Sequence, residues 1–432
     1  MAITDNPDAS QLKQSDRPRL LDALGPGLIT GAADDDPSGI ATYSQAGAAF
    51  GFSLIWTLVL TYPLMCAIQL ISAEIGRVTG KGIAANMRRS YPAPLLHALV
   101  ALLVLANVIN LGADLGAMAA ALTLILHGPQ WAYVAAFAAL VTVLEVFMRY
   151  ATYASVLRWL TLSLFAYVAT VFVVGVPWDK VAIHLVVPHI EWTGAYFTVV
   201  VAVFGTTISP YLFFWQASQE VEDEKEDRTA KPLLEAPAQA PRELARIRLD
   251  TAVGMAASNL VALFIVLTTA ATLNAHGVTD IETSADAAKA LRPIAGDFAF
   301  TIFALGVVGT GLLAVPVLAG SAAHALGEAL GWRVGLAKSP GRAPAFYCAI
   351  TAGIVIGALL NFSPIDPIKA LFWSAVVNGV AAVPIMAMIM LMASRRSVMG
   401  KFVIRPWLKA LGWAATAAMA AAAAGMIATW NA

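Results

Sequence analysis

The sequence predicts an all-α integral membrane protein with eleven transmembrane helices, ten of them arranged as a five-plus-five inverted repeat. Three observations lead to this prediction. Of the 432 residues, 59% are hydrophobic and only 12% are charged, whereas about a quarter of the residues in a soluble domain are charged. Apolar runs of about twenty residues, long enough to cross a bilayer, recur along the whole chain. Two of these runs are interrupted by a proline at corresponding places.

The eleven predicted spans follow one another along the chain. They cover roughly residues 24–48, 53–77, 94–126, 130–149, 153–176, 194–220, 250–274, 296–325, 344–361, 367–393 and 407–430. The first and the sixth spans contain the interruptions. The longer spans can tilt or project from the bilayer.

The spans divide the chain into two halves. We expect residues 1–20 to form a disordered cytoplasmic tail, and residues 21–176 to form the first half with helices 1–5. Residues 177–393 form the second half with helices 6–10, and residues 394–432 add a loop and helix 11. Five spans is an odd number, so the two halves have opposite topology. The charged, Pro/Ala-rich cytoplasmic loop 221–249 is expected to be a solvated linker with a short surface helix.

Lysine and arginine are distributed unequally between the two sets of connecting segments. With the N-terminus inside, 23 of the 27 basic residues fall in cytoplasmic segments. The outer segments hold only Lys180, Lys289, Arg292 and Lys369. Because basic residues are enriched in cytoplasmic loops, this asymmetry predicts a cytoplasmic N-terminus and an extracytoplasmic C-terminus. We expect a multi-pass protein of a bacterial-type cell (inner) membrane.

Composition excludes several other classes of protein. The formal net charge is zero, so nothing indicates binding to nucleic acid. The two cysteines, Cys66 and Cys348, both lie in apolar segments, which argues against a disulfide framework. The polar N-terminal stretch lacks the apolar core of a cleaved signal peptide.

The two interrupted spans carry the polar residues of a candidate ion site. The first reads ADDDPSGIATYSQAG around Pro37, and the second reads FGTTISPYLFFWQASQE around Pro210. A proline removes one backbone N–H and leaves the carbonyl four residues earlier without its helical partner. Such carbonyls are tolerated in a bilayer only where they line a polar cavity. A bound cation or water would satisfy them, and Asp36 supplies a negative charge beside two new helix N-termini.

The alternative is that the two prolines only kink their helices. One kink would carry little information, but two at corresponding positions, one beside an aspartate, indicate a transporter binding site. On a helix, Asp34 and Asp35 point away from Asp36, and we expect them to face an aqueous vestibule.

Four stretches match the helices of one transporter family. They are GPGLITGAADDDPSGIATYSQAGAAFG, QLISAEIGRVTGKGI, NLGADLGAM and LDTAVGMAASNLVALFIVL. They resemble the first, second, third and seventh helices of Nramp divalent-metal transporters, and the likeness runs from about Gly25 to the tenth helix. The resemblance implies a LeuT-type fold with broken helices 1 and 6, alternating access and often coupling to protons.

Three motifs depart from the pattern of that family. The first-helix signature Asp-Pro-Gly-Asn appears as DPSG at residues 36–39, so the aspartate stays and the asparagine ligand is lost. The sixth-helix signature Met-Pro-His appears as SPY at residues 209–211. The third-helix Asp-Leu-Ala-Glu appears as DLGA at residues 114–117, which keeps one of two carboxylates on the usual proton route.

The resemblance, with these changes, implies an ion site made of hard oxygen donors. The implied set comprises Asp36, the backbone carbonyls near Ala33 and Thr206, the hydroxyls of Ser38, Thr207 and Ser209, and Gly39 and Tyr211 at matched positions. Loss of the thioether removes a preference for softer metals, so the set suits Mg²⁺, Na⁺ or Ca²⁺ better than Fe²⁺. Asp36 is the one strong anionic metal ligand.

Polar residues in two other spans are candidates for a relay of protons or ions. Spacings of three and four residues place Asn107, Asn110 and Asp114 on one helix face. The alternative is a buried polar cluster that joins helices. The matched family position favours a relay for Asp114, and we expect Asn107 and Asn110 to be structural. Asn378 is the second relay candidate, because the family's tenth helix lines the site with a polar residue.

These features predict a secondary active transporter, not an enzyme, that moves a small inorganic ion. A hard divalent cation, Mg²⁺ or Mn²⁺, is favoured over Fe²⁺, with H⁺ or Na⁺ as coupling ion. The first alternative is a transporter of a bicarbonate-like anion, held by hydroxyls and helix N-termini. The second is a Mg²⁺-dependent membrane prenyltransferase with residues 34–36 and 220–224 as Asp-rich motifs. The expected partners are the lipid bilayer and the ion, with no other cofactor.

Overall fold

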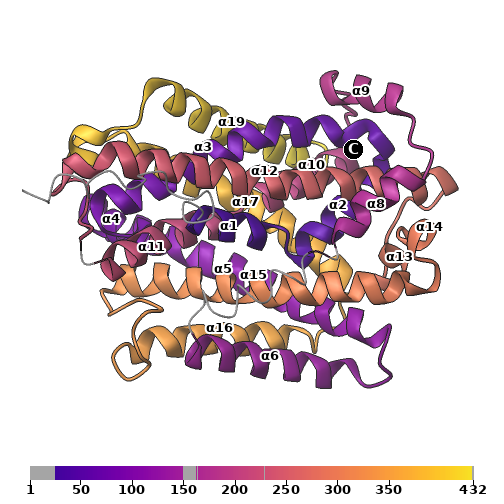
Figure 1. Cartoon of the computed structure of the whole chain (residues 1–432), viewed down its shortest axis with the longest axis horizontal. Coiled ribbons are helices and arrows are strands. Elements are labelled where there is room, and N and C mark those ends of the chain that lie inside the picture. The colour runs from indigo at the N-terminus through magenta and orange to yellow at the C-terminus, as the bar shows by residue number, and fades with distance from the viewer. Residues whose placement is uncertain (1–24, 149–161, 163, 228, 431–432) are drawn as a thin grey trace, which may run out of the picture.

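The computed structural model describes residues 25–148, 162, 164–227 and 229–430, and every regular element in these ranges is a helix (Figure 1). The N-terminal tail expected over residues 1–20 lies outside the described residues. In the described part of the chain, eight helical stretches are long and apolar enough to cross a membrane. The all-helical membrane architecture predicted from composition is therefore confirmed.

Each predicted span coincides with one helix or with a pair of half-helices. The first five correspond to α1 (Pro26–Asp34) with α2 (Pro37–Phe50), α3 (Ile55–Thr79), α5 (Ala93–Thr123), α6 (Gln130–Phe147) and α8 (Phe165–Val173). The others correspond to α10 (Gly194–Thr207) with α11 (Pro210–Glu226), α12 (Ala240–Thr272), α15 (Ala299–Leu330), α16 (Pro344–Leu360), α17 (Pro367–Ala393) and α19 (Pro406–Ala428). Part of the fifth span lies outside the described residues.

Short helices that were not predicted as separate elements connect the long ones. They are α4 (Ile83–Ser90), α9 (Trp178–Val186), α13 (Ser284–Lys289), α14 (Arg292–Ala295) and α18 (Arg396–Met399). Figure 1 places α4 and the end of α11 on the left, and α9, α13 and α14 on the right. We refer to these as the α4 end and the α9 end of the bundle. Lys180, Lys289 and Arg292 all belong to helices at the α9 end.

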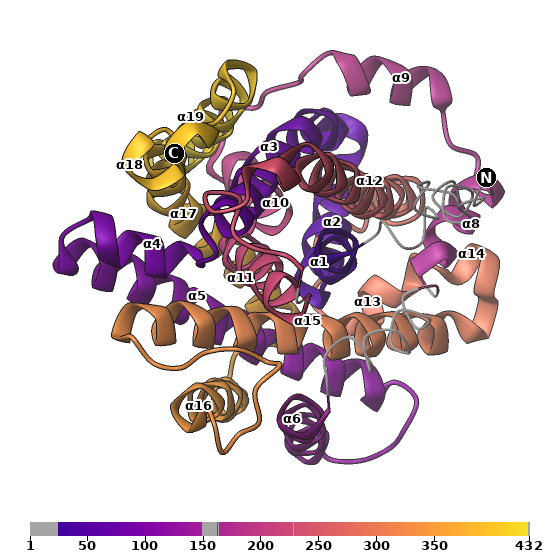
Figure 2. The ribbon, with the colours of Figure 1, turned by 60° about the vertical axis from the view of Figure 1, so that its left-hand side comes forward.

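Both helix breaks lie where the prolines predict them. α2 begins at Pro37 and α11 begins at Pro210, each at the first position of its helix. A proline fits there because the first N–H of a helix has no intrahelical partner and the ring already holds φ near the helical value. Figure 2 shows the four half-helices α1, α2, α10 and α11 inside a ring that includes α3, α12, α15 and α17, with α6 and α16 on the outside.

Close backbone contacts hold the half-helices against this ring. A Cβ atom on Gly31 of α1 would overlap the backbone of Gly254 in α12. A Cβ atom on Gly205 of α10 would overlap the backbone of α17 at Ala375 and Gly379. Only glycine permits such an approach. The two breaks therefore sit deep in the bundle, far from lipid.

The segment expected as a long solvated loop over residues 221–249 is mostly helical, which corrects that expectation. α11 continues to Glu226 and α12 starts at Ala240, because the Glu, Lys, Arg and Ala residues there are good helix formers. The remaining connection packs against α3. The Leu233 N–H donates to the Arg77 carbonyl at 3.2 Å, and the Leu233 side chain is fully buried.

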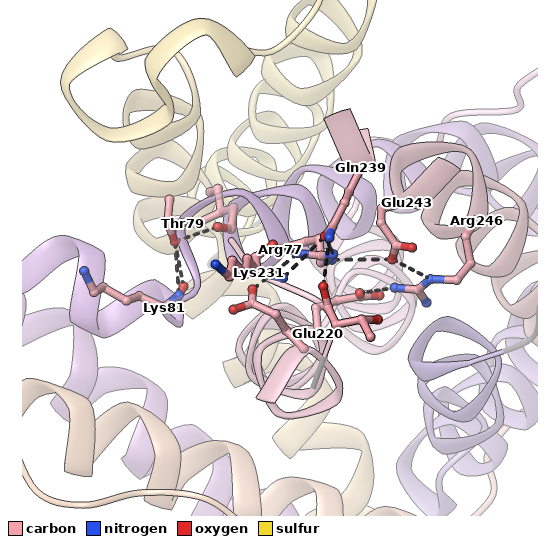
Figure 3. Close-up of polar contacts among 11 residues, drawn as sticks. Arg77, Thr79, Lys81, Glu220, Lys231, Gln239, Glu243 and Arg246 are labelled. Atoms are coloured by element: carbon pink, nitrogen blue, oxygen red, sulfur yellow. Dashed lines mark hydrogen bonds and ion pairs between the residues drawn. The ribbon is translucent and has the colours of Figure 1, made fainter. Parts of the chain in front are cut away.

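Arg77, near the end of α3, holds this connection in place (Figure 3). Its guanidinium donates to the Lys231 carbonyl at 2.6 Å and to Gln239 Oε1 at 3.2 Å. It also lies 3.4 Å from a carboxylate oxygen of Glu224 in α11 and of Glu243 in α12. Only 2% of the Arg77 side chain is exposed. One arginine thus joins three helices and a connecting segment at the α4 end.

Substitution of Arg77 tests the energetic weight of this junction. Arg77→Ala removes the guanidinium donor of the Glu224 carboxylate and of the Lys231 carbonyl, and removing one partner of a buried pair costs about 3 kcal/mol or more. We expect the melting temperature of the detergent-purified protein to fall by several degrees. Arg242→Ala, at an exposed arginine of α12, is the matched control and should melt like wild type. Equal melting of both variants contradicts the assignment.

Candidate functional site

Asp36 sits in the first break and caps α2. Its Oδ1 atom accepts a hydrogen bond from the Gly39 N–H at 2.7 Å and another from Ser38 Oγ at 2.7 Å. Aspartate is a favoured N-cap because it satisfies N–H groups of the first turn that have no helical partner. Ser38 and Gly39 are therefore brought to Asp36 by local structure. Only 1% of Asp36 is exposed.

The other oxygen of Asp36 joins helices that are distant in sequence. Asp36 Oδ2 accepts from Asn110 Nδ2 in α5 at 3.0 Å and lies 3.4 Å from the Tyr211 hydroxyl at the start of α11. Asn110 Oδ1 accepts in turn from Ser374 Oγ in α17 at 2.6 Å. Asn110, which was expected to be structural, thus joins Asp36 to α17, and that expectation stays a prediction. Its spacing from Asp114 was the available signal, whereas nothing in the sequence indicated Ser374.

The two breaks lie against each other. The Tyr211 hydroxyl donates to the backbone carbonyl of Ala33, the last but one residue of α1, at 3.1 Å. A Cβ atom on Gly39 would lie 3.3 Å from Thr206 Oγ1. Ala33, Gly39, Thr206 and Tyr211, predicted as site residues from two separate stretches, are thus neighbours of Asp36.

The hydroxyls of the second break are engaged by their own helix. Ser209 Oγ donates to the carbonyls of Gly205 at 2.7 Å and Thr206 at 2.9 Å. Thr207 Oγ1 donates to the Val203 carbonyl at 2.7 Å. A serine hydroxyl has one proton and two lone pairs, so Ser209 keeps acceptor capacity for an ion.

Asp34 and Asp35 face α12 and not an aqueous vestibule, which corrects the expectation for these two residues. Ser258 Oγ lies 2.5 Å from Asp34 Oδ2 and 3.1 Å from Asp35 Oδ1. Asp34 is 1% exposed and Asp35 is 7% exposed. Ser258 was missed by sequence analysis, because a single serine in an apolar span is not distinguished by any pattern.

Of the predicted relay residues, Asp114 is the one that interacts with Asp36. It is fully buried, neither carboxylate oxygen closes a hydrogen bond within the described residues, and it interacts electrostatically with Asp36 and the Ser38 amide. Asn378 is buried in α17, four residues after Ser374 and so on the same helix face. Its Oδ1 atom closes no hydrogen bond with a described residue. Asn107 instead binds Ser321 of α15 at 2.7 Å.

The site is rich in carboxyl groups. Asp34, Asp35, Asp36 and Asp114 are all buried, and none forms an ion pair with a lysine or arginine among the described residues. Buried charges in proteins are normally paired or bind metal ions. Nevertheless, no group of three or more His, Cys, Asp or Glu side chains converges on a metal position in the described ranges. The arrangement attracts cations but does not enclose a bare ion with several carboxylates.

The surroundings of the half-helices differ between the two ends of the bundle. At the α4 end, the Asp250 carboxylate of α12 accepts from the backbone N–H groups of Gly25, Gly27 and Leu28 at 2.9, 2.6 and 3.0 Å. These bonds fasten the start of α1 to α12. Towards the α9 end, a cavity of about 650 Å³ opens beside α2, and Gln45 is among its lining residues.

The Asp250 contacts predict a testable change in accessibility. Asp250→Asn keeps the side-chain shape, but its amide nitrogen cannot accept a backbone N–H, so the hold on α1 weakens by about 1 kcal/mol or more. We expect a thiol reporter, Thr30→Cys in a chain without Cys66 and Cys348, to react about tenfold faster with a polar maleimide. The reporter with Asp250 intact gives the baseline rate, and an unchanged rate would show that Asp250 does not restrain α1.

Comparisons with known proteins agree with this geometry. A family model described as "Natural resistance-associated macrophage protein-like" matches residues 27–429. A "Divalent metal cation transporter MntH" of Yersinia pestis (strain Pestoides F) is 27% identical over 299 residues, covering 68% of this chain and 69% of that protein. A protein of the same name from Burkholderia ambifaria is 28% identical over 406 residues, covering 92% of this chain and 86% of that protein.

Two solved structures show the same fold at low sequence identity. A mutant of the Eremococcus coleocola manganese transporter superposes with a TM-score of 0.73 at 17% identity, covering 92% of this chain and 84% of that one. A nucleobase-cation-symport-1 family transporter in a closed conformation gives 0.55 at 14% identity, covering 94% and 92%. The LeuT-like fold that the sequence resemblance implied is thereby confirmed.

Proposed function

The chain belongs to the Nramp family, a family of transporters and not of enzymes, and on this premise we propose that it carries a hard divalent cation, Mg²⁺ or Mn²⁺, by alternating access. Membership of this family removes the prenyltransferase alternative. The names of the relatives from Yersinia pestis and Burkholderia ambifaria support a divalent metal cation, and that of the Eremococcus coleocola transporter supports manganese.

The observation that carries the proposal is the buried charge around the first break. Four buried carboxylates without a basic partner favour a cation, because an ionised carboxylate in a membrane interior costs several kcal/mol unless an opposite charge or donors compensate it. A bicarbonate-like anion would add to the negative charge. Within the described residues, no lysine or arginine forms an ion pair with these four carboxylates. The geometry therefore disfavours the anion alternative.

The chemistry of the donors supports Mg²⁺ or Mn²⁺ over Fe²⁺. Ser209 stands where the family has a thioether, so the groups near Asp36 are hard oxygens. Both oxygens of Asp36 already accept hydrogen bonds, and carboxylates do not converge. An ion that keeps several waters fits such a site, and Mg²⁺ gives up its waters reluctantly.

We further propose the arrangement in which this ion moves. Residues 21–176 and 177–393 form inverted halves of five spans each, residues 394–432 add an eleventh span, and the N-terminus faces the cytoplasm. The ion binds between the breaks at Pro37 and Pro210. Asp114 and Asn378 relay a coupling H⁺ or Na⁺. The break allows α1 to tilt as one body, and the glycine contacts of α1 with α12 restrain this tilt.

Loss of the Asp36 charge is the first test of the ion site. Asp36→Asn should abolish uptake of Mg²⁺ and Mn²⁺ into proteoliposomes, because it removes the charge nearest both breaks. Asp366→Asn is a matched control, since Asp366 also caps a helix, accepting from the Ile368 N–H at 2.9 Å, but lies at the start of α17. This control should transport at the wild-type rate. Wild-type uptake by Asp36→Asn would remove Asp36 from the site.

A second test addresses the identity of the substrate. Wild-type protein should transport Mg²⁺ or Mn²⁺ and should give no flux of radiolabelled bicarbonate above empty liposomes. Ser209→Met restores a soft donor and should raise the ratio of Cd²⁺ to Mg²⁺ uptake about tenfold. Thr142→Met in α6, at a threonine that bonds its own helix at the Ala138 carbonyl, is the control and should leave the ratio unchanged. Bicarbonate flux without cation flux would establish the anion alternative instead.

A further inference from the structure

The carboxylates of Asp34 and Asp35 accept from Ser258 and not from the groups that hold Asp36. Asp36 contacts α5 and α11, whereas Asp34 and Asp35 both face Ser258 in α12. The three aspartates do not converge on a common metal position. Consecutive residues on the turn between α1 and α2 thus direct their carboxylates to two different places.

The contact with Ser258 leaves a carboxylate oxygen without a donor. The Ser258 hydroxyl has one proton and approaches both Asp34 Oδ2 and Asp35 Oδ1, so it can donate to only one of them. The second oxygen of Asp34 closes no hydrogen bond with any described residue. Two buried carboxylates that share one hydroxyl repel each other unless a cation or a proton lies between them.

A separate oxygen is turned towards the same place. The Tyr43 hydroxyl in α2 is fully buried, has Thr206 as a hydrogen-bond neighbour, and interacts electrostatically with all three aspartates. A Cβ atom on Gly39 would lie 3.3 Å from Tyr43 Cε2 and 3.4 Å from the Asp34 carbonyl, so the ring lies close to the backbone at Asp34. The buried oxygen that lacks a partner among the described residues is Asp34 Oδ1, and such an atom indicates a missing ligand.

We propose that Asp34, Asp35 and Ser258 form a second cation site, between α1 and α12, which binds a sodium-sized monovalent cation. As the site of a coupling ion, this assignment rests on the proposed function. A divalent ion at Asp36 leaves the other two carboxylates uncompensated. A second divalent ion close by would be repelled by the first, whereas a monovalent ion suffers half that repulsion. Carboxylate and hydroxyl oxygens are the ligands that hard cations prefer.

The position of this site gives the cation a mechanical effect. Ser258 lies four residues after Gly254 in α12, and Asp34 lies three residues after Gly31 in α1, on matching helix faces, while Asp35 directly follows α1. Gly31 and Gly254 are the residues at which the two backbones touch. A cation bound one turn away therefore strengthens the closed contact between α1 and α12. Binding of Na⁺ at the α12 side and of the substrate at Asp36 would both restrain the same half-helix.

Melting of the detergent-purified full-length protein in NaCl or choline chloride tests the site without any transport. Na⁺ should raise the melting temperature of wild type and of Asp36→Asn. Asp35→Asn should lose this response, and Ser258→Ala should need at least tenfold more Na⁺ for the same shift. Ser72→Ala, at a buried serine that bonds only its own helix at the Ile68 carbonyl, is the matched control and should respond like wild type. Asp35→Glu, which keeps the charge, should retain part of the response.

The outcomes distinguish this proposal from the proposed function. Absence of a Na⁺ response in wild type, or an equal response in every variant, overturns the second site. In proteoliposomes, Mg²⁺ or Mn²⁺ uptake should increase with an inward Na⁺ gradient at constant pH. Uptake driven only by a pH gradient and lost in Asp35→Asn also overturns it, because the pair would then carry a proton. A Na⁺ response specific to Asp35 and Ser258, without any divalent uptake, keeps this site and refutes the transport proposal.

Discussion

Polar groups inside a lipid bilayer must find their partners within the protein, and the arrangement of this molecule around its two broken helices follows from that constraint. Each proline opens a helix and exposes backbone carbonyls. The Ala33 carbonyl is satisfied by the Tyr211 hydroxyl of the other break, and the start of α2 is satisfied by Asp36. The second break therefore supplies a donor that the first break lacks, and this bond holds the two interruptions side by side.

Asp36 is the point at which these requirements meet. One of its oxygens satisfies the first turn of α2, and the other receives Asn110 from α5, which is itself held by Ser374 of α17. A carboxylate bound in this way is sensitive to displacement of any of these helices. The buried Asp36 carboxylate and the geometry of the bundle are thus linked through a single residue. Such a link is what the proposed alternating access requires.

α12 holds α1 in place, because α12 contacts the start, the middle and the end of α1. Asp250 fastens the start of α1, Gly254 meets Gly31 in its middle, and Ser258 receives the aspartates at its end. At the α4 end, Arg77 then joins α12 to α3 and α11. Movement of α1 relative to α12 would break the Asp250 hydrogen bonds, the glycine backbone contact and the Ser258 hydrogen bonds. Together these contacts restrain α1 against α12.

The sequence by itself determined the helices, both breaks and the unequal charge of the two ends. These depend on local physics: an apolar run of sufficient length forms a helix in a bilayer, and a proline interrupts it wherever it occurs. It also placed Asp36, Ser38 and Gly39 together, since an N-cap is formed within one turn. The extension of α11 and α12 into the charged loop was misjudged, because good helix formers were taken for a solvated linker.

Only the tertiary structure decided which residues complete the site. Asn110, Ser258 and Ser374 lie 74, 224 and 264 residues from the groups they bind, and no spacing rule connects such positions. The directions of Asp34 and Asp35 were undetermined for the same reason. A residue on the turn between two half-helices can point to several neighbours, and the packing of α12 against α1 through glycine selects one of them. Partners across a bundle are set by which helix faces meet, and that is a property of the whole fold.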